Sequence, residues 1–255
     1  MNAPVLNPSE RSLEQRAPVH VREKRNDPEQ RQKIEEALWV HNRGWITGRR
    51  GGRPWTLSRT KRYAEAGIAL ALLVLLLPVL LGIAVLVKLS SPGPVLFVQR
   101  RTGYRGRHFN MFKFRTMVTN AEELKESLRH LNKHGADAID FKIDNDPRVT
   151  PIGRWLRRTS LDELPNLFNV VRGDMRLIGP RPTSFGASRY DTRHLSRLSV
   201  YPGITGLWQI SGRSDIDFDE RVKLDMDYIR RQGPLLDLLI LLKTPAEVLR
   251  GHGAS

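Results

Sequence analysis

The longest apolar stretch of the chain, residues 66–87, runs for 22 residues without a charged side chain. Crossing the hydrocarbon core of a bilayer takes about 20 helical residues. A helix in the core of a soluble protein is rarely apolar on every side. The pattern therefore predicts a helix that inserts into a membrane.

The path of this segment depends on Pro78, which divides it into limbs of twelve and nine residues. A proline inside a helix removes a hydrogen bond and favours a kink or a break. A kinked spanning helix is the default expectation. Basic residues tend to stay on the cytoplasmic side, and they flank both ends, which favours a re-entrant path. They are Arg43, Arg49, Arg50, Arg53, Arg59, Lys61 and Arg62 before the segment, and Lys88, Arg100, Arg101, Arg105 and Arg107 after it. The residues alone leave both paths open.

Alternating apolar and polar residues predict a β-hairpin after the break at SPGP, residues 91–94. The segments VLFVQRR and RHFNMFKFR flank turn residues 103–106. Residues 121–133 have a charged helical pattern. Residues 234–249 are apolar but too short to span a bilayer, so we expect a helix that packs against the domain or lies in the membrane interface.

The pattern divides the chain into four parts. Residues 1–58 form a polar N-terminal extension, with one helix opened by Asp27 and Pro28. Residues 59–90 contain the membrane segment, residues 91–232 form the main domain, and residues 233–255 form the C-terminal helix and tail.

Charge narrows the choice of partner. The chain has 42 Lys and Arg against 27 Asp and Glu, a net charge of +15, which predicts an anionic partner such as nucleic acid, a phosphate-rich molecule or anionic lipid. It has no cysteine, which excludes disulfides, thiolate catalysis and zinc–thiolate sites. Its seven histidines show no metal-binding spacing.

Two adjacent acids, Asp162 and Glu163, lie within RRTSLDELPNLFNVV, residues 157–171. Ser160 and Glu163 fit a capping box, an ordinary helix start. Pro165 weakens this interpretation, because it would lose a hydrogen bond at the fifth helical position. With Asp162 as the cap, Pro165 falls at the third position, where no N–H is needed. The pattern therefore predicts a helix that begins at the acids.

Basic residues accompany these acids. Arg154, Arg157 and Arg158 precede them at helical spacing, LIGPRPTS holds Arg181 between two prolines, and Lys113 lies in the predicted hairpin. Arginine forks bind phosphate oxygens, and two adjacent carboxylates can hold Mg²⁺ or attack phosphorus. The alternative is an ion-pair network on the surface.

The stretch YPGITGLWQISGRS, residues 201–214, combines three glycines with Trp208 and Gln209. The glycines predict a backbone that approaches a ligand, and the tryptophan predicts a stacking surface. The stretch matches neither common phosphate-binding loop, so this signal is weak.

Six motifs follow one another from about residue 59 to residue 249: KRYAE, SPGPVLFVQRRTG, FKFRTM, NDPRVTPIGRWLRRTSLDELPNLFNVVRGDMRLIGPRP, PGITGLWQISGR and LDMDYI. In this order they resemble the bacterial sugar transferase family, the monotopic phosphoglycosyl transferases. Members transfer a sugar 1-phosphate from a nucleoside diphosphate sugar, usually UDP-linked, to polyprenyl phosphate, and they release the nucleoside monophosphate.

The resemblance implies roles for individual residues. Asp162 is the nucleophile that forms an aspartyl phospho-sugar intermediate, which polyprenyl phosphate then attacks. Glu163 supports a metal or positions the acceptor, and both acids hold Mg²⁺, or Mn²⁺ in its place. Lys113, Arg157 and Arg181 bind substrate phosphates.

The resemblance also implies a fold and a setting. The fold is mixed α+β and mostly α, with a re-entrant membrane helix-break-helix at Pro78, followed by a small cytoplasmic catalytic domain with a β-hairpin and interfacial amphipathic helices. Expected partners are a UDP-sugar, polyprenyl (undecaprenyl) phosphate, membrane lipid, a second copy of the chain and downstream glycosyltransferases, with no nucleic acid. The expected location is the cytoplasmic face of the bacterial inner membrane, at the start of exopolysaccharide, capsule, O-antigen or glycoprotein glycan assembly.

Two positions depart from the family pattern: Glu65 replaces a common Asp, and Leu77 replaces a Ser before the breaking proline. Two other functions remain as alternatives. The net charge suggests a membrane-tethered nucleic-acid binder, and an inactive scaffold for polysaccharide assembly is the other. The sequence does not indicate which sugar is transferred.

Overall fold

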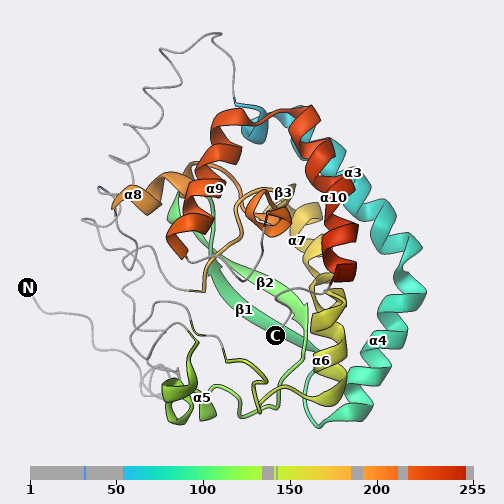
Figure 1. Ribbon diagram of the computed structural model, residues 1–255. Helices are drawn as coiled ribbons and strands as arrows, with labels where there is room; N and C mark the ends of the chain where they lie inside the picture. The colour runs from blue at the N-terminus through green and yellow to red at the C-terminus, as the bar shows by residue number, and fades with distance from the viewer. Residues whose placement is uncertain are drawn as a thin grey trace, which may run out of the picture.

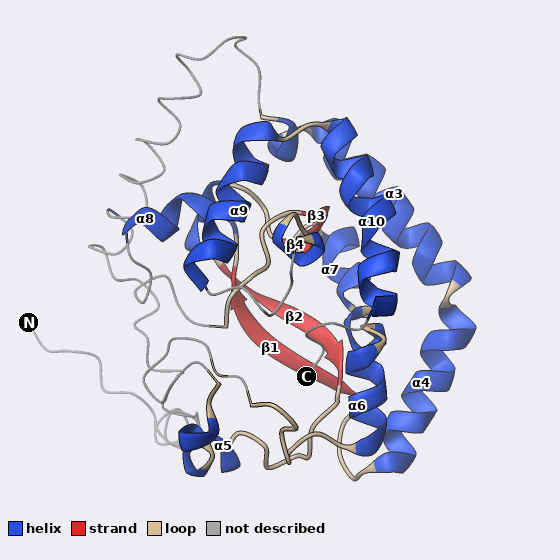
Figure 2. Cartoon of the chain, in the orientation of Figure 1, coloured by secondary structure: helices blue, strands red, loops and turns tan. Residues whose placement is uncertain are grey.

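The computed structural model describes Gln32 and residues 54–133, 141, 143–184, 192–211 and 218–250. These residues form a mixed α+β structure that is mostly helical and has two small sheets, which confirms the predicted mixture of helices and strands (Figures 1 and 2). The helix expected to open at Asp27, and most of the N-terminal extension, lie outside the described residues.

The helices and strands follow in chain order. The α-helices are α3 (Arg59–Leu75), α4 (Leu77–Ser90), α5 (Leu124–Ser127), α6 (Pro151–Arg158), α7 (Asn166–Arg172), α8 (Thr192–Leu195), α9 (Phe218–Arg231) and α10 (Pro234–Arg250). The strands are β1 (Leu96–Thr102), β2 (His108–Phe114), β3 (Arg176–Ile178) and β4 (Gly203–Thr205). The 3-10 turns are η2 (Trp55–Leu57), η3 (Tyr104–Gly106), η4 (Arg129–Leu131), η5 (Leu161–Glu163), η7 (Ser196–Ser199) and η8 (Trp208–Ile210).

The apolar segment forms two helices, α3 and α4, which meet at Leu76 with a bend of 64°. Pro78 follows two residues later, and its ring excludes the hydrogen bond that would continue α3 through this point. No single helix among the described residues is long and apolar enough to cross a bilayer. Helices α3 and α4 reach the required length and apolar character only when they are taken together.

One face of the bent pair packs on the domain. Ala69 and Leu73 of α3 join Leu80, Ile83 and Val87 of α4 in the hydrophobic core. The opposite face is exposed and equally apolar, with Leu70, Val74, Leu75, Leu81, Val85 and Leu86. Figure 1 shows α3 and α4 along one side of the molecule, with α10 beside α3.

A buried polar network fastens the start of α3 to the domain. The Lys61 ammonium donates to Glu65 Oε1 at 2.7 Å and also to the Asp237 carboxylate of α10. Asp237 accepts further hydrogen bonds from Trp55 Nε1 at 2.7 Å and from the Tyr228 hydroxyl of α9 at 2.8 Å. Buried charges need such partners. The network therefore fixes the start of α3 and the start of α10 relative to each other and to α9.

Strands β1 and β2 form the predicted antiparallel hairpin around turn residues 103–106. The outer edge of β2 is closed by one side chain. Asn169 of α7 accepts from the Phe112 N–H at 3.2 Å and donates to the Asn110 carbonyl at 2.7 Å. The amide thereby replaces a neighbouring strand and fixes α7 against β2.

Strands β3 and β4 pair in parallel, with Arg176 opposite Gly203. A Cβ on Gly203 would lie 2.1 Å from the Gly179 nitrogen. This glycine therefore serves the approach of two backbone segments, not the ligand approach that we predicted from its loop. Trp208 of the same loop is buried, while Gly212 lies outside the described residues.

Two helix predictions need correction. Ser160 has a left-handed backbone and makes no side-chain cap, so the capping box is absent, and α7 begins at Asn166 instead of at the acids. Since Pro165 has no N–H to bond the Leu161 carbonyl, that carbonyl accepts from Leu164 and the acids lie in a 3-10 turn. Within residues 121–133, only the short α5 and η4 are helical.

Candidate active site

The adjacent acids occupy η5, between α6 and α7. The chain reverses at Ser160, whose φ of 55° is uncommon for a residue other than glycine. Gly153 lets α6 pack closely on the segment that follows β2, because a Cβ on Gly153 would lie 2.1 Å from the Thr116 carbonyl oxygen. These two features bring η5 against the end of β2.

Glu163 is held by two cations. Lys113 Nζ of β2 donates to Glu163 Oε1 at 2.8 Å, and Arg181 Nη1 donates to Oε2 at 2.9 Å. Arg181 Nη2 also donates to Oε1, which makes the arginine pair bidentate. Burial alone would raise the pKa of Glu163, but the two cations outweigh it and hold the pKa well below its usual range. Glu163 is therefore a fixed anion.

Asp162 has the opposite environment. Asp162 is buried, with a relative exposure of 8%, and its carboxylate has no hydrogen-bond partner among the described residues. Burial raises the pKa of Asp162 to about 6, although Lys113 opposes this and Glu163 adds to it. A carboxylate with unengaged oxygen atoms therefore lies beside a fixed one.

Arg157 is the member of the arginine cluster that reaches this region. Its Nε donates to Thr116 Oγ1 at 2.9 Å, and its charge acts on Asp162. Burial lowers the pKa of Arg157. Arg154 and Arg158 are exposed on the same helix and do not join the site. The structure thus gathers Lys113, Arg157 and Arg181 around the acids.

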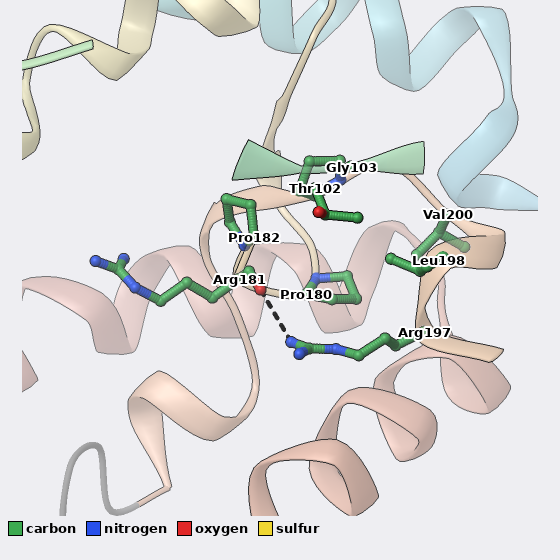
Figure 3. A pocket seen from close by; sticks show the side chains of 9 residues that line it. Thr102, Gly103, Pro180, Arg181, Pro182, Arg197, Leu198 and Val200 are labelled. Atoms are coloured by element: carbon green, nitrogen blue, oxygen red, sulfur yellow. Dashed lines mark hydrogen bonds between the residues drawn. The ribbon is translucent and has the colours of Figure 1, made fainter. Parts of the chain in front are cut away.

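The direction of the Arg181 side chain is set by the backbone turn at residues 180–182. Two other arginines bind carbonyl oxygens of this turn and hold it in place. Arg197 of η7 donates to the Arg181 carbonyl oxygen at 2.9 Å, and the same guanidinium pairs with buried Asp225 of α9. Figure 3 shows the Arg197 guanidinium pointing at this carbonyl, while the Arg181 side chain extends away. Arg101 Nη1 also donates to the neighbouring Pro182 carbonyl at 3.3 Å.

Sequence reasoning missed Arg197 and Asp225, and also Asn169 and Thr116. One signal was available for Asp225: it occurs at helical spacing between Val222 and Tyr228, on the apolar stripe of α9. A carboxylate on a buried face needs a partner. No comparable pattern marks Arg197, whose partner is distant in sequence.

The donor set limits how a metal could bind. Among the described residues, no group of three or more His, Asp or Glu side chains converges. Mg²⁺ usually binds one or two carboxylates and completes its shell with water and substrate phosphates. Asp162 can supply such a carboxylate, whereas both Glu163 oxygens are engaged by cations. The residues fit an ion that substrate phosphates help to hold.

An unengaged carboxylate beside three cations is an arrangement that can bind a phosphate group and attack phosphorus. The chain belongs to the bacterial sugar transferase family, whose model matches residues 56–251, and this confirms the resemblance.

Three relatives illustrate the similarity. Galactosyl transferase CpsE of Streptococcus agalactiae is 48% identical over 164 residues, 64% of this chain and 36% of that protein. The undecaprenyl-phosphate galactose phosphotransferase of Salmonella typhimurium is 48% identical over 165 residues, 64% of this chain and 35% of that protein. Exopolysaccharide production protein ExoY of Rhizobium meliloti is 40% identical over 197 residues, 76% of this chain and 87% of that protein. The match covers about a third of the first two relatives and most of ExoY.

The two acids should affect stability in opposite directions. Because Asp162 carries a raised pKa, its ionised form costs folding free energy, and wild-type stability falls as the pH rises through the interval from its ordinary value to about 6. Asp162→Asn removes that cost and should raise the Tm in detergent micelles at pH 7.5. The increase should shrink at pH 4.5, where the wild-type carboxyl is largely protonated.

The matched control is Glu163→Gln, which leaves Lys113 and Arg181 without their anion. It should lower the Tm, with a loss on the order of 3 kcal/mol. A lower Tm for both variants would contradict the contrast between the two acids.

Proposed function

We propose that the protein transfers a sugar 1-phosphate from a UDP-sugar to polyprenyl phosphate, with undecaprenyl phosphate as the expected acceptor, and releases UMP. Family membership supports this reaction class, and so do the relatives named as undecaprenyl-phosphate galactose and glucose phosphotransferases. The reaction would initiate exopolysaccharide, capsule, O-antigen or glycoprotein glycan assembly.

The contrast between the two acids carries the proposal. Neighbouring carboxyl groups whose environments push their pKa values apart generally have different chemical roles. Glu163 has both oxygens in ion pairs, whereas Asp162 has neither oxygen in a hydrogen bond to the described residues. Asp162 is therefore the acid that can attack, and Glu163 is the one that positions.

The reaction has two steps. In the first, an Asp162 carboxylate oxygen forms a bond to the sugar-bearing phosphorus, and the bond from that phosphorus to the UMP oxygen breaks. In the second, an oxygen of polyprenyl phosphate attacks the same phosphorus, and the aspartyl bond breaks. The carboxylate is regenerated, and the product is a polyprenyl diphosphate sugar.

The surrounding cations stabilise the charge that develops on phosphorus-bound oxygens. Arg157 has guanidinium N–H groups beyond the one that holds Thr116, and it lies near Asp162. Lys113 and Arg181 keep Glu163 in place and present positive charge to the same space. A Mg²⁺ ion bound by Asp162 and the donor phosphates, with Mn²⁺ as its substitute, would neutralise the pyrophosphate.

We also propose that α3 and α4 enter the cytoplasmic face of the bacterial inner membrane and return to it. The bend at Leu76, the apolar outer face and the basic residues on both flanks support this path. Leu77, which replaces the serine of the family pattern, is half exposed on this outer surface. The expected second copy of the chain and the downstream glycosyltransferases stay predictions.

Release of UMP tests the reaction. Purified protein mixed with its UDP-sugar and Mg²⁺, without acceptor, should release about one UMP per enzyme, because the intermediate cannot turn over. Since Asp162 must be ionised to attack, kcat/KM should rise as the pH increases through about 6 and then level off. Asp162→Asn should release no UMP.

Full activity of Asp162→Asn would contradict the assignment of the nucleophile. The absence of UMP release across a broad panel of UDP-sugars would favour the inactive scaffold. Steeply salt-dependent binding to DNA or RNA would favour the nucleic-acid binder.

The hydrogen bond from Arg197 to the Arg181 carbonyl should matter for turnover. Arg197→Met frees the turn that aims Arg181, and small displacements of catalytic groups cost on the order of 10- to 100-fold in kcat. Arg197→Lys should restore part of this loss, because an ammonium can still donate to the Arg181 carbonyl. The control is Arg62→Met. It likewise removes an arginine that binds backbone carbonyl oxygens, but these belong to Val170 and Val171 and not to Arg181. Equal losses in Arg197→Met and Arg62→Met would indicate a general effect on folding.

Labelling tests the membrane path. The chain has no cysteine, so Ser58→Cys and Pro92→Cys each provide one label site on either side of the apolar segment. In oriented membrane vesicles, an impermeant thiol reagent should reach both from the cytoplasmic side. Labelling from opposite sides would show a spanning helix.

A further inference from the structure

A cavity of about 240 Å³ lies where the C-terminal part of α10 faces η5, α7 and the segment from β4 to η8. Six apolar side chains line it: Leu161, Leu164, Leu167, Ile204, Ile210 and Val248. Glu163, whose carboxylate is held by two cations, is also a lining residue, and Asp162 directly precedes it in the chain. The cavity therefore begins at the candidate active site and reaches the last turns of α10.

Two polar side chains of this wall, Thr244 and Gln209, already make hydrogen bonds within the protein. Thr244 Oγ1 donates to the Ile240 carbonyl at 2.7 Å and lies 2.9 Å from Thr205 Oγ1. Gln209 Nε2 donates to the Ile204 carbonyl at 3.0 Å, and Gln209 Oε1 is the one buried side-chain atom of this lining without a hydrogen-bond partner among the described residues. A sugar would need free hydrogen-bonding groups at several of its hydroxyls. The surface left to a ligand is mainly apolar, which suits a hydrocarbon.

One face of α10 lines the cavity, and its opposite face is part of the apolar exterior of the molecule. Four leucines on the outer face of this helix are exposed: Leu235, Leu238, Leu239 and Leu242. Figure 1 shows α10 beside α3, whose outer face is also apolar. An apolar surface of this kind is typical of helices that lie in a membrane interface. A chain leaving the cavity along α10 would therefore enter lipid without first crossing water.

We propose that this cavity receives the isoprene units nearest the phosphate of the polyprenyl acceptor. The proposal rests on the proposed function. The acceptor phosphate must reach a phosphorus on Asp162, so the hydrocarbon joined to it begins beside Glu163. Placing these first isoprene units against the apolar wall is favourable, because both apolar surfaces then leave water. The cavity holds the start of the chain, and the remainder lies in the bilayer.

A second cavity does not fit this ligand. It lies between the 180–182 turn, Thr102 and Arg197, and its volume is about 10 Å³ (Figure 3). Such a space holds about one water molecule at most. This second space is therefore too small for an isoprene unit.

The two half-reactions allow a direct test. Val248→Trp fills the cavity from α10, and Ile204→Phe fills it from the opposite wall. Each should raise KM for polyprenyl phosphate by about 10-fold or more and leave the UMP burst and its dependence on UDP-sugar unchanged. The control is Leu242→Trp, which adds the same ring on the outer face of α10 and should change neither half-reaction.

An unchanged KM for polyprenyl phosphate in both cavity variants would overturn the proposal, since the cavity would then hold no part of the acceptor. A raised KM for UDP-sugar, with the acceptor step unchanged, would overturn it in favour of a sugar site. A normal burst in these variants also shows that they are folded.

A second measurement does not depend on turnover. A short prenyl phosphate that carries a benzophenone on its second isoprene unit should crosslink, in the full chain, to peptides that contain residues 161–167 or 244–248. Unlabelled polyprenyl phosphate should compete, and phosphatidylglycerol should not. Crosslinks confined to α3 and α4, or competition by phosphatidylglycerol alone, would contradict the proposal. If crosslinking succeeds while wild-type protein releases no UMP, the acceptor site stands and the proposed reaction fails.

Discussion

The ion pairs of Glu163 with Lys113 and Arg181 are the interaction on which the rest of the site depends. They join three segments that are distant in sequence: the end of the hairpin, the 3-10 turn η5 and the turn between two prolines. Two of these segments have a further support: Asn169 binds the edge of β2, and Arg197 donates to the Arg181 carbonyl. Because these supports act on the partners of Glu163, they also fix the position of its neighbour, Asp162.

The site combines one satisfied carboxylate with one that is not. Burying a charge without direct partners costs stability, and proteins accept this cost mainly at functional positions. Asp162 remains buried because the segment around it is held elsewhere. The membrane helices contribute as well: Lys61, Glu65 and Asp237 link α3 and α10 to the domain, so the apolar exterior is held in a defined place relative to the acids.

Much of the fold follows from patterns that are local in sequence. The hairpin was predictable from alternation around a glycine-containing turn, and the C-terminal helix from the apolar character and length of its segment. The predictions that failed depended on distant contacts. The glycine of β4 is required by the backbone of Gly179, and the start of α7 follows from the exchange of hydrogen bonds that Pro165 imposes. Asp162, Glu163, Lys113, Arg157 and Arg181 were identified from sequence and lie together, whereas Arg197 and Asn169 act through pairings that no local pattern shows.

The central claim is that Asp162 carries the sugar phosphate between donor and acceptor, and mass spectrometry of the enzyme tests it most directly. The protein is incubated with UDP-sugar and Mg²⁺ without acceptor, quenched and digested with trypsin. The peptide of residues 159–172 should gain the mass of a sugar 1-phosphate, and fragmentation should place it on Asp162. An adduct on Glu163, or product formation with acceptor but no adduct at all, would contradict the account.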